Sequence, residues 1–174
     1  MFDIIIRGDQ VVTPHGTGAW DLYIKGEVIA AVSHPEQFID NQAVRIIDAT
    51  GKLVIPGGID PHIHSLWHIP AIEKGGEVKY TDGPDVVSRA AIHGGTTSLL
   101  DFATWGHGKT LEEAINIRKQ DWTDKCYTDY GYHIMLQGAI PHDLYPQIAE
   151  VIQEGYPSIK IFTTDITPSR KGRK

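Results

Sequence analysis

The sequence contains very little cysteine. Cys126 is the single cysteine among 174 residues, so it cannot form an internal disulfide, and nothing indicates an oxidising compartment. Long apolar runs are also missing, and the short one in MFDIIIRGD at the start is below the length of a signal peptide or a membrane span. We therefore expect a soluble, cytoplasmic protein without a membrane partner.

Clustered positive charge is a third absence. The net charge is −6, and no basic block precedes the last five residues, 170–174. Domains that bind nucleic acid usually carry a basic patch or stripe, so we expect no nucleic-acid partner. The chain is 41% hydrophobic and 22% charged, which is typical of a globular protein. Its length suits one domain, or a small domain plus part of a larger one.

Two patterns divide the chain, and the first covers residues 1–55. Short runs rich in Val and Ile alternate there with Gly, Pro, Asn and Asp, which predicts a small all-β segment of meander or sandwich type. The separate runs DIIIRG and QVVTP indicate two short strands. A tight hairpin is expected at Lys25-Gly26-Glu27, where Gly26 can adopt a positive φ.

The second pattern covers residues 56–174, where strands alternate with helices. Strands are predicted in 53–64, 96–103, 130–137 and 158–164, and helices in 83–94, 110–122 and 142–155. This order indicates parallel βαβ units, which could form an open doubly wound sheet or a (β/α)8 barrel. The first strand lacks a glycine-rich phosphate-binding pattern and precedes a long, apparently structureless connection, 65–82. Both features favour a barrel, of which four of eight units would be present.

Two histidines one residue apart end the apolar stretch LVIPGGIDPHIH. Residues i and i+2 of a strand point to the same side, so His62 and His64 can aim at one point. Catalytic groups of a barrel lie at the C-terminal ends of its strands, and two imidazoles there can share a divalent cation. An isolated His-x-His is more often two ordinary histidines. The framing residues Pro56-Gly57-Gly58 and Asp60, after an apolar strand, favour a metal site.

Lys160 is the second unusual residue, because it lies inside the apolar strand SIKIF. Its side chain points the opposite way from Ile159 and Ile161, so it would lie inside a barrel while the isoleucines face the helices. A lone buried ammonium is costly, and a neutral amine can add CO2 to become a carbamate that bridges two metals. A lysine that reaches solvent or pairs with a carboxylate is the ordinary alternative. Beside the histidine pair, Lys160 is predicted to be a metal ligand.

Two further polar residues lie on the predicted strands. His133 alternates within 130–137 and can therefore face the barrel interior. Asp101 ends the strand 96–103, and we expect it to be a hydrogen-bonding group beside the site rather than a metal ligand.

The ordered set of motifs resembles the amidohydrolase superfamily, and within it the dihydropyrimidinase and hydantoinase group of cyclic amidases. PGGIDPHIH and GYPSIKIF carry the resemblance, supported by DIIIRGDQVVTP, AVRIIDATGKLVIPG and AIHGGTTSLLDFA. It implies a (β/α)8 hydrolase barrel whose first four units are residues 56–174, preceded by a β-sandwich segment, residues 1–55. It also implies a homo-oligomer when the protein is complete.

The resemblance implies a binuclear metal site, commonly zinc. His62 and His64 would hold one metal, and carboxylated Lys160 would bridge the two. A hydroxide held by the metals would attack the ring amide carbon of a small cyclic amide substrate.

The chain departs from the family pattern in two ways. The remaining family ligands, two histidines and an acid/base aspartate, come from strands five, six and eight, so we expect this chain alone to be truncated, inactive and prone to associate through open sheet edges. Asp165 stands where the family has a substrate-binding tyrosine, and a carboxylate stabilises an oxyanion only when protonated. A dihydroorotase or allantoinase type of enzyme, or a non-catalytic scaffold of the same fold, therefore remain alternatives.

Overall fold

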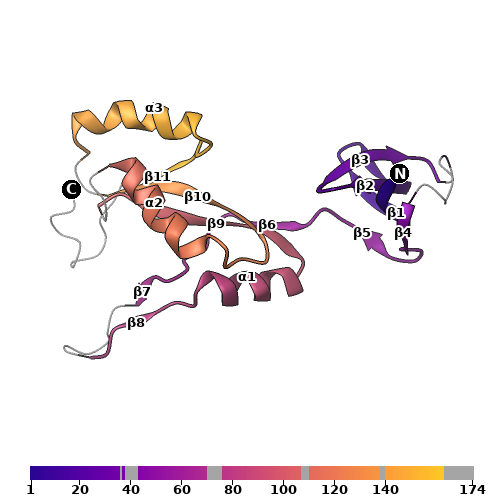
Figure 1. Ribbon diagram of the computed structural model, residues 1–174, viewed down its shortest axis with the longest axis horizontal. Coiled ribbons are helices and arrows are strands. Elements are labelled where there is room, and N and C mark those ends of the chain that lie inside the picture. Colours follow the sequence, from indigo (N-terminus) through magenta and orange to yellow (C-terminus); the bar gives the residue numbers. More distant parts are fainter. Residues whose placement is uncertain (36, 38–42, 70–75, 107–109, 138–139, 163–174) are drawn as a thin grey trace. The chain divides into compact units, whose positions relative to one another are not determined.

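The computed structural model describes residues 1–35, 37, 43–69, 76–106, 110–137 and 140–162. The chain divides into two compact units, Met1–Pro56 and Gly57–Lys174 (Figure 1). No helix within the described ranges is long and apolar enough to cross a membrane.

The first unit is a β-sheet, as the sequence predicts. Its strands are β1 (Phe2–Thr13), β2 (Gly16–Lys25), β3 (Val28–Ser33), β4 (Ala43–Asp48) and β5 (Leu53–Val54). The sheet order is β3-β2-β1-β4, and β5 pairs with β1. The β2–β3 turn is the predicted hairpin, with Gly26 at φ +60°. The two strands expected in residues 3–14 are one strand, because an irregularity in register between Gly8 and Val11 lets pairing with β2 continue.

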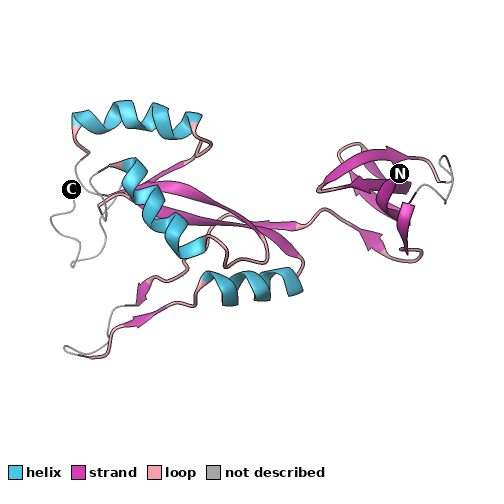
Figure 2. Cartoon of the chain, in the orientation of Figure 1, coloured by secondary structure: helices cyan, strands magenta, loops and turns pink. Residues whose placement is uncertain are grey.

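The second unit contains a parallel sheet with helices. Its strands, in the order β11-β10-β9-β6, are β6 (Gly58–Asp60), β9 (Thr96–Thr104), β10 (Asp129–Leu136) and β11 (Ile159–Ile161). Its helices are α1 (Pro84–His93), α2 (Leu111–Trp122) and α3 (Tyr145–Gln153), the last after a 3-10 turn, η2 (His142–Leu144). All three strand pairs are parallel, so the predicted βαβ alternation is confirmed over the described residues (Figure 2). The sheet is consistent with part of a barrel.

The helices begin where local chemistry predicts. Pro84 occupies the first turn of α1, and Gly94 caps its C-terminal end. Helix α2 starts with the predicted capping box, in which the Thr110 hydroxyl accepts from the Glu113 amide and the Glu113 carboxylate accepts from the Thr110 amide.

One face of the parallel sheet packs against the helices. The core is formed by residues of β9, β10, α2, η2 and α3, namely Leu99, Ala103, Tyr132, Ile134, Leu136, Leu111, Ile115, Trp122, Leu144 and Val151. Because neighbouring residues of a strand point to opposite faces, Phe102 and His133 lie on the other side of this sheet.

The predicted first strand is wrong in its extent. Leu53 and Val54 pair with β1 in the first unit, whereas β6 is only three residues long and exposed, with Ile59 67% accessible. Pro56 has no amide hydrogen to donate, so it separates the two pairings. His62 and His64 consequently lie just beyond β6 rather than in a buried strand.

The connection 65–82 is not structureless. It contains an antiparallel pair of short strands, β7 (His68–Ile69) and β8 (Lys79–Tyr80). Only the segment 70–75 between them falls outside the described residues.

Candidate active site

Two imidazoles meet beyond the C-terminal end of β6. The ring centroids of His62 and His64 lie 5.1 Å apart, with an interplanar angle of 85°. Each ring also lies 4.8 Å from the ring of Phe102 in β9. The backbone amide of His62 donates to the Asp60 carboxylate at 3.1 Å, which turns the chain as it leaves the strand. The two histidines therefore converge on one aromatic side chain.

Lys160 reaches the same place from β11. Its Nζ lies 3.4 Å from His62 Nε2 and 4.2 Å from the ring centroid of Phe102. The side chain is half-buried rather than fully buried. Its neighbours Ile159 and Ile161 pair in register with the core residues Ile134 and Leu136, so they face the helix side of the sheet as expected, although they are 37% and 57% exposed. The three residues predicted to be metal ligands are thus brought together around Phe102.

Burial makes His64 a weak base. Desolvation lowers the pKa of His64, and the positive charge of Lys160 lowers it further. A lowered pKa leaves the imidazole neutral near pH 7, and a neutral imidazole is the form that binds metal. The Nδ1 atom of His64 is buried and has no hydrogen-bond partner among the described residues.

These features fit part of a metal site. A buried polar nitrogen without a hydrogen-bond partner is rare. A bound cation would account for it here, because a ring nitrogen of histidine can coordinate a metal ion. His62 and His64 provide two imidazoles, and Lys160 provides a nitrogen beside them. Within the described ranges, no group of three or more His, Cys, Asp or Glu residues is placed to hold a metal ion. His62, His64 and Lys160 therefore fit part of a metal site that needs further ligands.

His133 lies at the centre of this sheet face, where its position on the strand predicts it. Its ring centroid is 5.2 Å from that of Phe102. Its Nε2 lies 2.8 Å from the Pro61 carbonyl oxygen, and its Nδ1 lies 2.6 Å from Ser158 Oγ. A carbonyl only accepts, so Nε2 carries the hydrogen, and in the neutral ring Nδ1 then accepts from the serine hydroxyl. Both nitrogens are occupied, and His133 ties the segment before His62 to the segment before Lys160.

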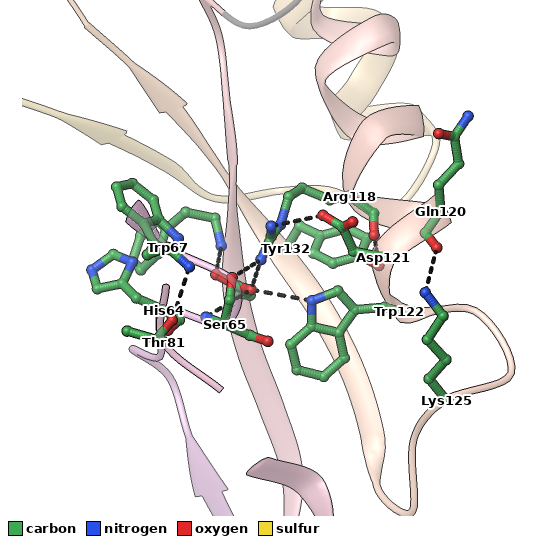
Figure 3. A network of polar contacts seen from close by, with 12 residues as sticks. His64, Ser65, Trp67, Thr81, Arg118, Gln120, Asp121, Trp122, Lys125 and Tyr132 are labelled. Carbon is green, nitrogen blue, oxygen red and sulfur yellow. Dashed lines mark hydrogen bonds and ion pairs between the residues drawn. The ribbon is translucent and has the colours of Figure 1, made fainter. Parts of the chain in front are cut away.

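Asp101 is fully buried beneath the histidine segment, on the helix side of the sheet. Its carboxylate accepts from Arg118 Nη2 and, at 3.1 Å, from Trp122 Nε1, both on α2. It also faces the Ser65 amide at 3.4 Å. Figure 3 shows Arg118 and Trp122 turned toward Ser65. Asp101 is thus a hydrogen-bonding group beside the site, as expected from the sequence.

Arg118 was not singled out from the sequence, although a signal is present. Leu111, Ile115, Arg118 and Trp122 follow the spacing of one helix face, and the other three are fully buried. An arginine on an apolar helix face requires a buried anion, because an unpaired buried charge is costly. Phe102 and Ser158 carried no comparable signal.

Asp165, at the position of the family's tyrosine, lies outside the described residues. Its effect on substrate binding stays a prediction.

Comparisons with known proteins give consistent relatives. The chain is 35% identical over 159 residues to a D-hydantoinase of Geobacillus stearothermophilus, covering 91% of this chain and 32% of the relative. It is 33% identical over 134 residues to a dihydropyrimidinase of Rattus norvegicus, covering 75% and 24%. Among solved structures, a dihydropyrimidinase from Brevibacillus agri matches with a TM-score of 0.76 and 35% identity, covering 97% of this chain and 34% of that one.

No family model matches the chain. The chain spans about one third of the length of the curated D-hydantoinases that it matches, at 32% and 33% of the first two. Sequence and structure comparisons nevertheless agree on the same group of proteins. The resemblance predicted from the motifs is confirmed: over most of its length the chain is similar to D-hydantoinases and dihydropyrimidinases.

Proposed function

We propose that the protein containing this chain hydrolyses a carbon–nitrogen bond of a cyclic amide, at a metal site to which His62, His64 and Lys160 contribute. The observation that carries this proposal is the convergence of these three side chains on Phe102, in a chain similar to D-hydantoinases and dihydropyrimidinases. We also propose that the four parallel strands are part of a (β/α)8 barrel.

Divalent metal ions would supply a water of lowered pKa and polarise the amide carbonyl. The chain's own residues prepare that site. Desolvation lowers the pKa of His64 and so favours its neutral form, and its buried Nδ1 has no hydrogen-bond partner in the described part of the chain. His62 accepts from, or donates to, Lys160 through Nε2. The buried ring of Phe102 forms an apolar floor beneath all three, which excludes water from one side.

Lys160 is proposed to be carboxylated in the complete site. Its neutral Nζ would form a bond to the carbon of CO2, and the displaced proton would pass to solvent, leaving a carbamate anion. The proposal is supported by the position of Nζ, which lies 3.4 Å from His62 Nε2, on the side of the sheet where the two candidate histidine ligands meet. Carbon-13 NMR after equilibration with labelled bicarbonate should give a carbamate signal that Lys160→Ala removes. A metal-loaded protein without that signal would contradict this step.

The experiment for the main proposal combines metal analysis with a substrate panel. The natural protein that contains these residues should hold divalent metal and hydrolyse dihydrouracil or hydantoin. His62→Ala should lose metal and lower kcat/KM at least about 100-fold, because a ligand is removed. His93→Ala, on the exposed end of α1, is the matched control and should retain both.

The panel also includes dihydroorotate and allantoin, which represent the other amidohydrolase types that the sequence leaves open. Hydrolysis of only dihydroorotate or only allantoin would assign that compound, rather than dihydrouracil or hydantoin, as the substrate type. Full activity in metal-free His62→Ala would contradict the metal site. A folded protein without metal and without turnover on any of the four compounds would favour a non-catalytic scaffold.

A further inference from the structure

The backbone just after His64 is held on both sides by buried groups. Arg118 Nη2 donates to the Ser65 carbonyl oxygen at 2.7 Å, while the Ser65 amide faces the Asp101 carboxylate at 3.4 Å. Arg118 Nη2 also pairs with the same carboxylate oxygen. Ser65 is fully buried, as is Asp101. The peptide groups of Ser65, next to the candidate ligand His64, are therefore held by the Asp101–Arg118 ion pair.

The charge of Asp101 is needed to satisfy its surroundings. Its Oδ1 accepts from the Phe102 amide at 2.7 Å, and its Oδ2 faces the Ser65 amide, Arg118 Nη2 and Trp122 Nε1. All of these groups are donors, and an ionised carboxylate can accept at both oxygens. An asparagine would turn an NH2 group toward one set of donors, whichever way it is oriented. The arrangement therefore selects aspartate specifically.

A second set of contacts holds the other peptide groups of the same segment. The Thr81 hydroxyl donates to the His64 carbonyl oxygen at 2.7 Å and accepts from the Trp67 amide at 2.8 Å. Figure 3 shows Thr81 beside His64 and Trp67, on the side of Ser65 away from Arg118. His64 is thus fixed at its own carbonyl and at the next residue.

The segment also contains an uncommon backbone conformation. Leu66 has φ +53°, in the left-handed region that residues with a side chain rarely adopt. Such a conformation persists only where surrounding contacts impose it, and it is concentrated at functional sites. The Leu66 amide donates to the Asp82 carbonyl at 3.1 Å, and Ser65 Oγ donates to the same oxygen at 3.0 Å. The chain is forced into this turn directly after His64.

We propose that Asp101 and Arg118 are positioning residues for His64: their buried ion pair holds Ser65 so that the His64 imidazole stays between Trp67 and Phe102. The ring centroids of these two residues lie 4.3 Å and 4.8 Å from that of His64. Neither Asp101 nor Arg118 touches the imidazole, so the effect passes through the backbone of Ser65. The expected effect on metal binding rests on the proposed function. The placement of the His64 imidazole is independent of that function.

Asp101→Asn is the test, compared with two controls in the complete natural protein. Asp121→Asn removes the other carboxylate that pairs with Arg118, through Nη1 at 2.9 Å, and leaves Ser65 untouched. Val151→Ala opens the core at α3 and lowers the melting temperature without reaching the segment. Comparison at a temperature where all variants are folded separates positioning from general destabilisation.

The first measurement is the NMR spectrum of the His64 imidazole without added metal. Rings beside Trp67 and Phe102 experience ring-current shifts, so the His64 signals should move toward ordinary histidine values in Asp101→Asn. They should stay in place in Asp121→Asn and Val151→Ala. Unchanged His64 signals in Asp101→Asn would overturn the proposal, whether or not the protein binds metal.

The second measurement is Zn2+ affinity together with kcat and KM. Asp101→Asn should weaken Zn2+ binding about 10-fold or more and lower kcat with little change in KM, since the supporting contacts of a ligand are lost. Both controls should stay within about twofold of the parent protein. Equal losses of Zn2+ affinity and kcat in Asp101→Asn and Val151→Ala would show that the ion pair contributes only to stability. A parent protein that binds no Zn2+ but shows the NMR effect would refute the proposed function and retain the positioning role.

Discussion

At the residue scale, Gly57 shows how little space the chain has as it enters the second unit. A Cβ built on Gly57 would lie 2.1 Å from Thr97 Oγ1 and 2.7 Å from Thr97 Cβ, closer than real atoms approach. Gly57→Ala should therefore lower the free energy of unfolding by about 1–3 kcal/mol through overpacking. Urea denaturation of the purified protein measures this loss.

The neighbouring glycine provides the control. A Cβ on Gly58 would meet its nearest atom, Thr96 Oγ1, at 3.2 Å, so Gly58→Ala requires only a small adjustment. Adding Thr97→Gly to Gly57→Ala should restore part of the lost stability, because the three atoms nearest to the added Cβ all belong to the Thr97 side chain. An equal effect of both alanines, or no restoration, would contradict this account.

At the scale of elements, His133 joins three neighbouring segments of the parallel sheet. It lies on β10 and contacts Pro61 beyond β6 and Ser158 before β11. His133→Phe keeps an aromatic ring against Phe102 but loses both polar contacts. We expect a loss of about 1–2 kcal/mol in unfolding free energy, at roughly 1 kcal/mol for each hydrogen bond. Ser158→Ala removes one contact and should cost about half as much; a larger loss than in His133→Phe would exclude the double tie.

Helix α2 carries the positioning arginine, and its start depends on Thr110. The Thr110 hydroxyl accepts from the Glu113 amide at 3.0 Å. Thr110→Ala should cost about 1 kcal/mol of stability, whereas Thr110→Ser keeps the hydroxyl and should cost little. Thermal unfolding of the two variants measures the difference, and equal melting temperatures would show that the cap contributes nothing.

At the scale of the whole molecule, the parallel sheet has two open sides. In the described part of the chain, β6 and β11 each pair with one strand of that sheet. Ile159, Ile161 and Phe162 at β11 are 37%, 57% and 45% exposed. Unpaired backbone groups beside exposed apolar side chains favour association between copies. We therefore expect the 174-residue chain, produced alone, to form concentration-dependent dimers or larger species in light scattering. We also expect it to show no hydrolysis of dihydrouracil or hydantoin.

A single charge tests which edge is responsible. Ile161→Lys should shift the chain toward monomer, because a lysine on an edge strand opposes edge-to-edge pairing. Ile152→Lys adds the same charge on α3, where Ile152 is 43% exposed, and should leave the association unchanged. A monomeric parent chain at high concentration, or equal effects of the two lysines, would contradict an interface at β11.

Local chemistry in the sequence was sufficient for much of the fold and for the candidate ligands. Pro84 and the Thr110–Glu113 box place helix starts through contacts within four residues, so tertiary structure adds little to them. The alternation of strands and helices is also visible locally. It predicts parallel pairing, because a helix between two strands provides the crossover that parallel neighbours need. Lys160 could be singled out because one charged residue interrupts an apolar strand.

Only the tertiary structure decided which distant segments pair. Leu53 and Val54 join β1 rather than β6, since a short apolar strand is stabilised by whichever edge lies within reach, and that choice is not written in its own residues. The meeting of Asp101 with Arg118 and Ser65 is likewise invisible in the sequence. It joins three residues from distant parts of the chain, and the charges of Asp101 and Arg118 are compatible with burial only because the fold places the two side chains beside each other.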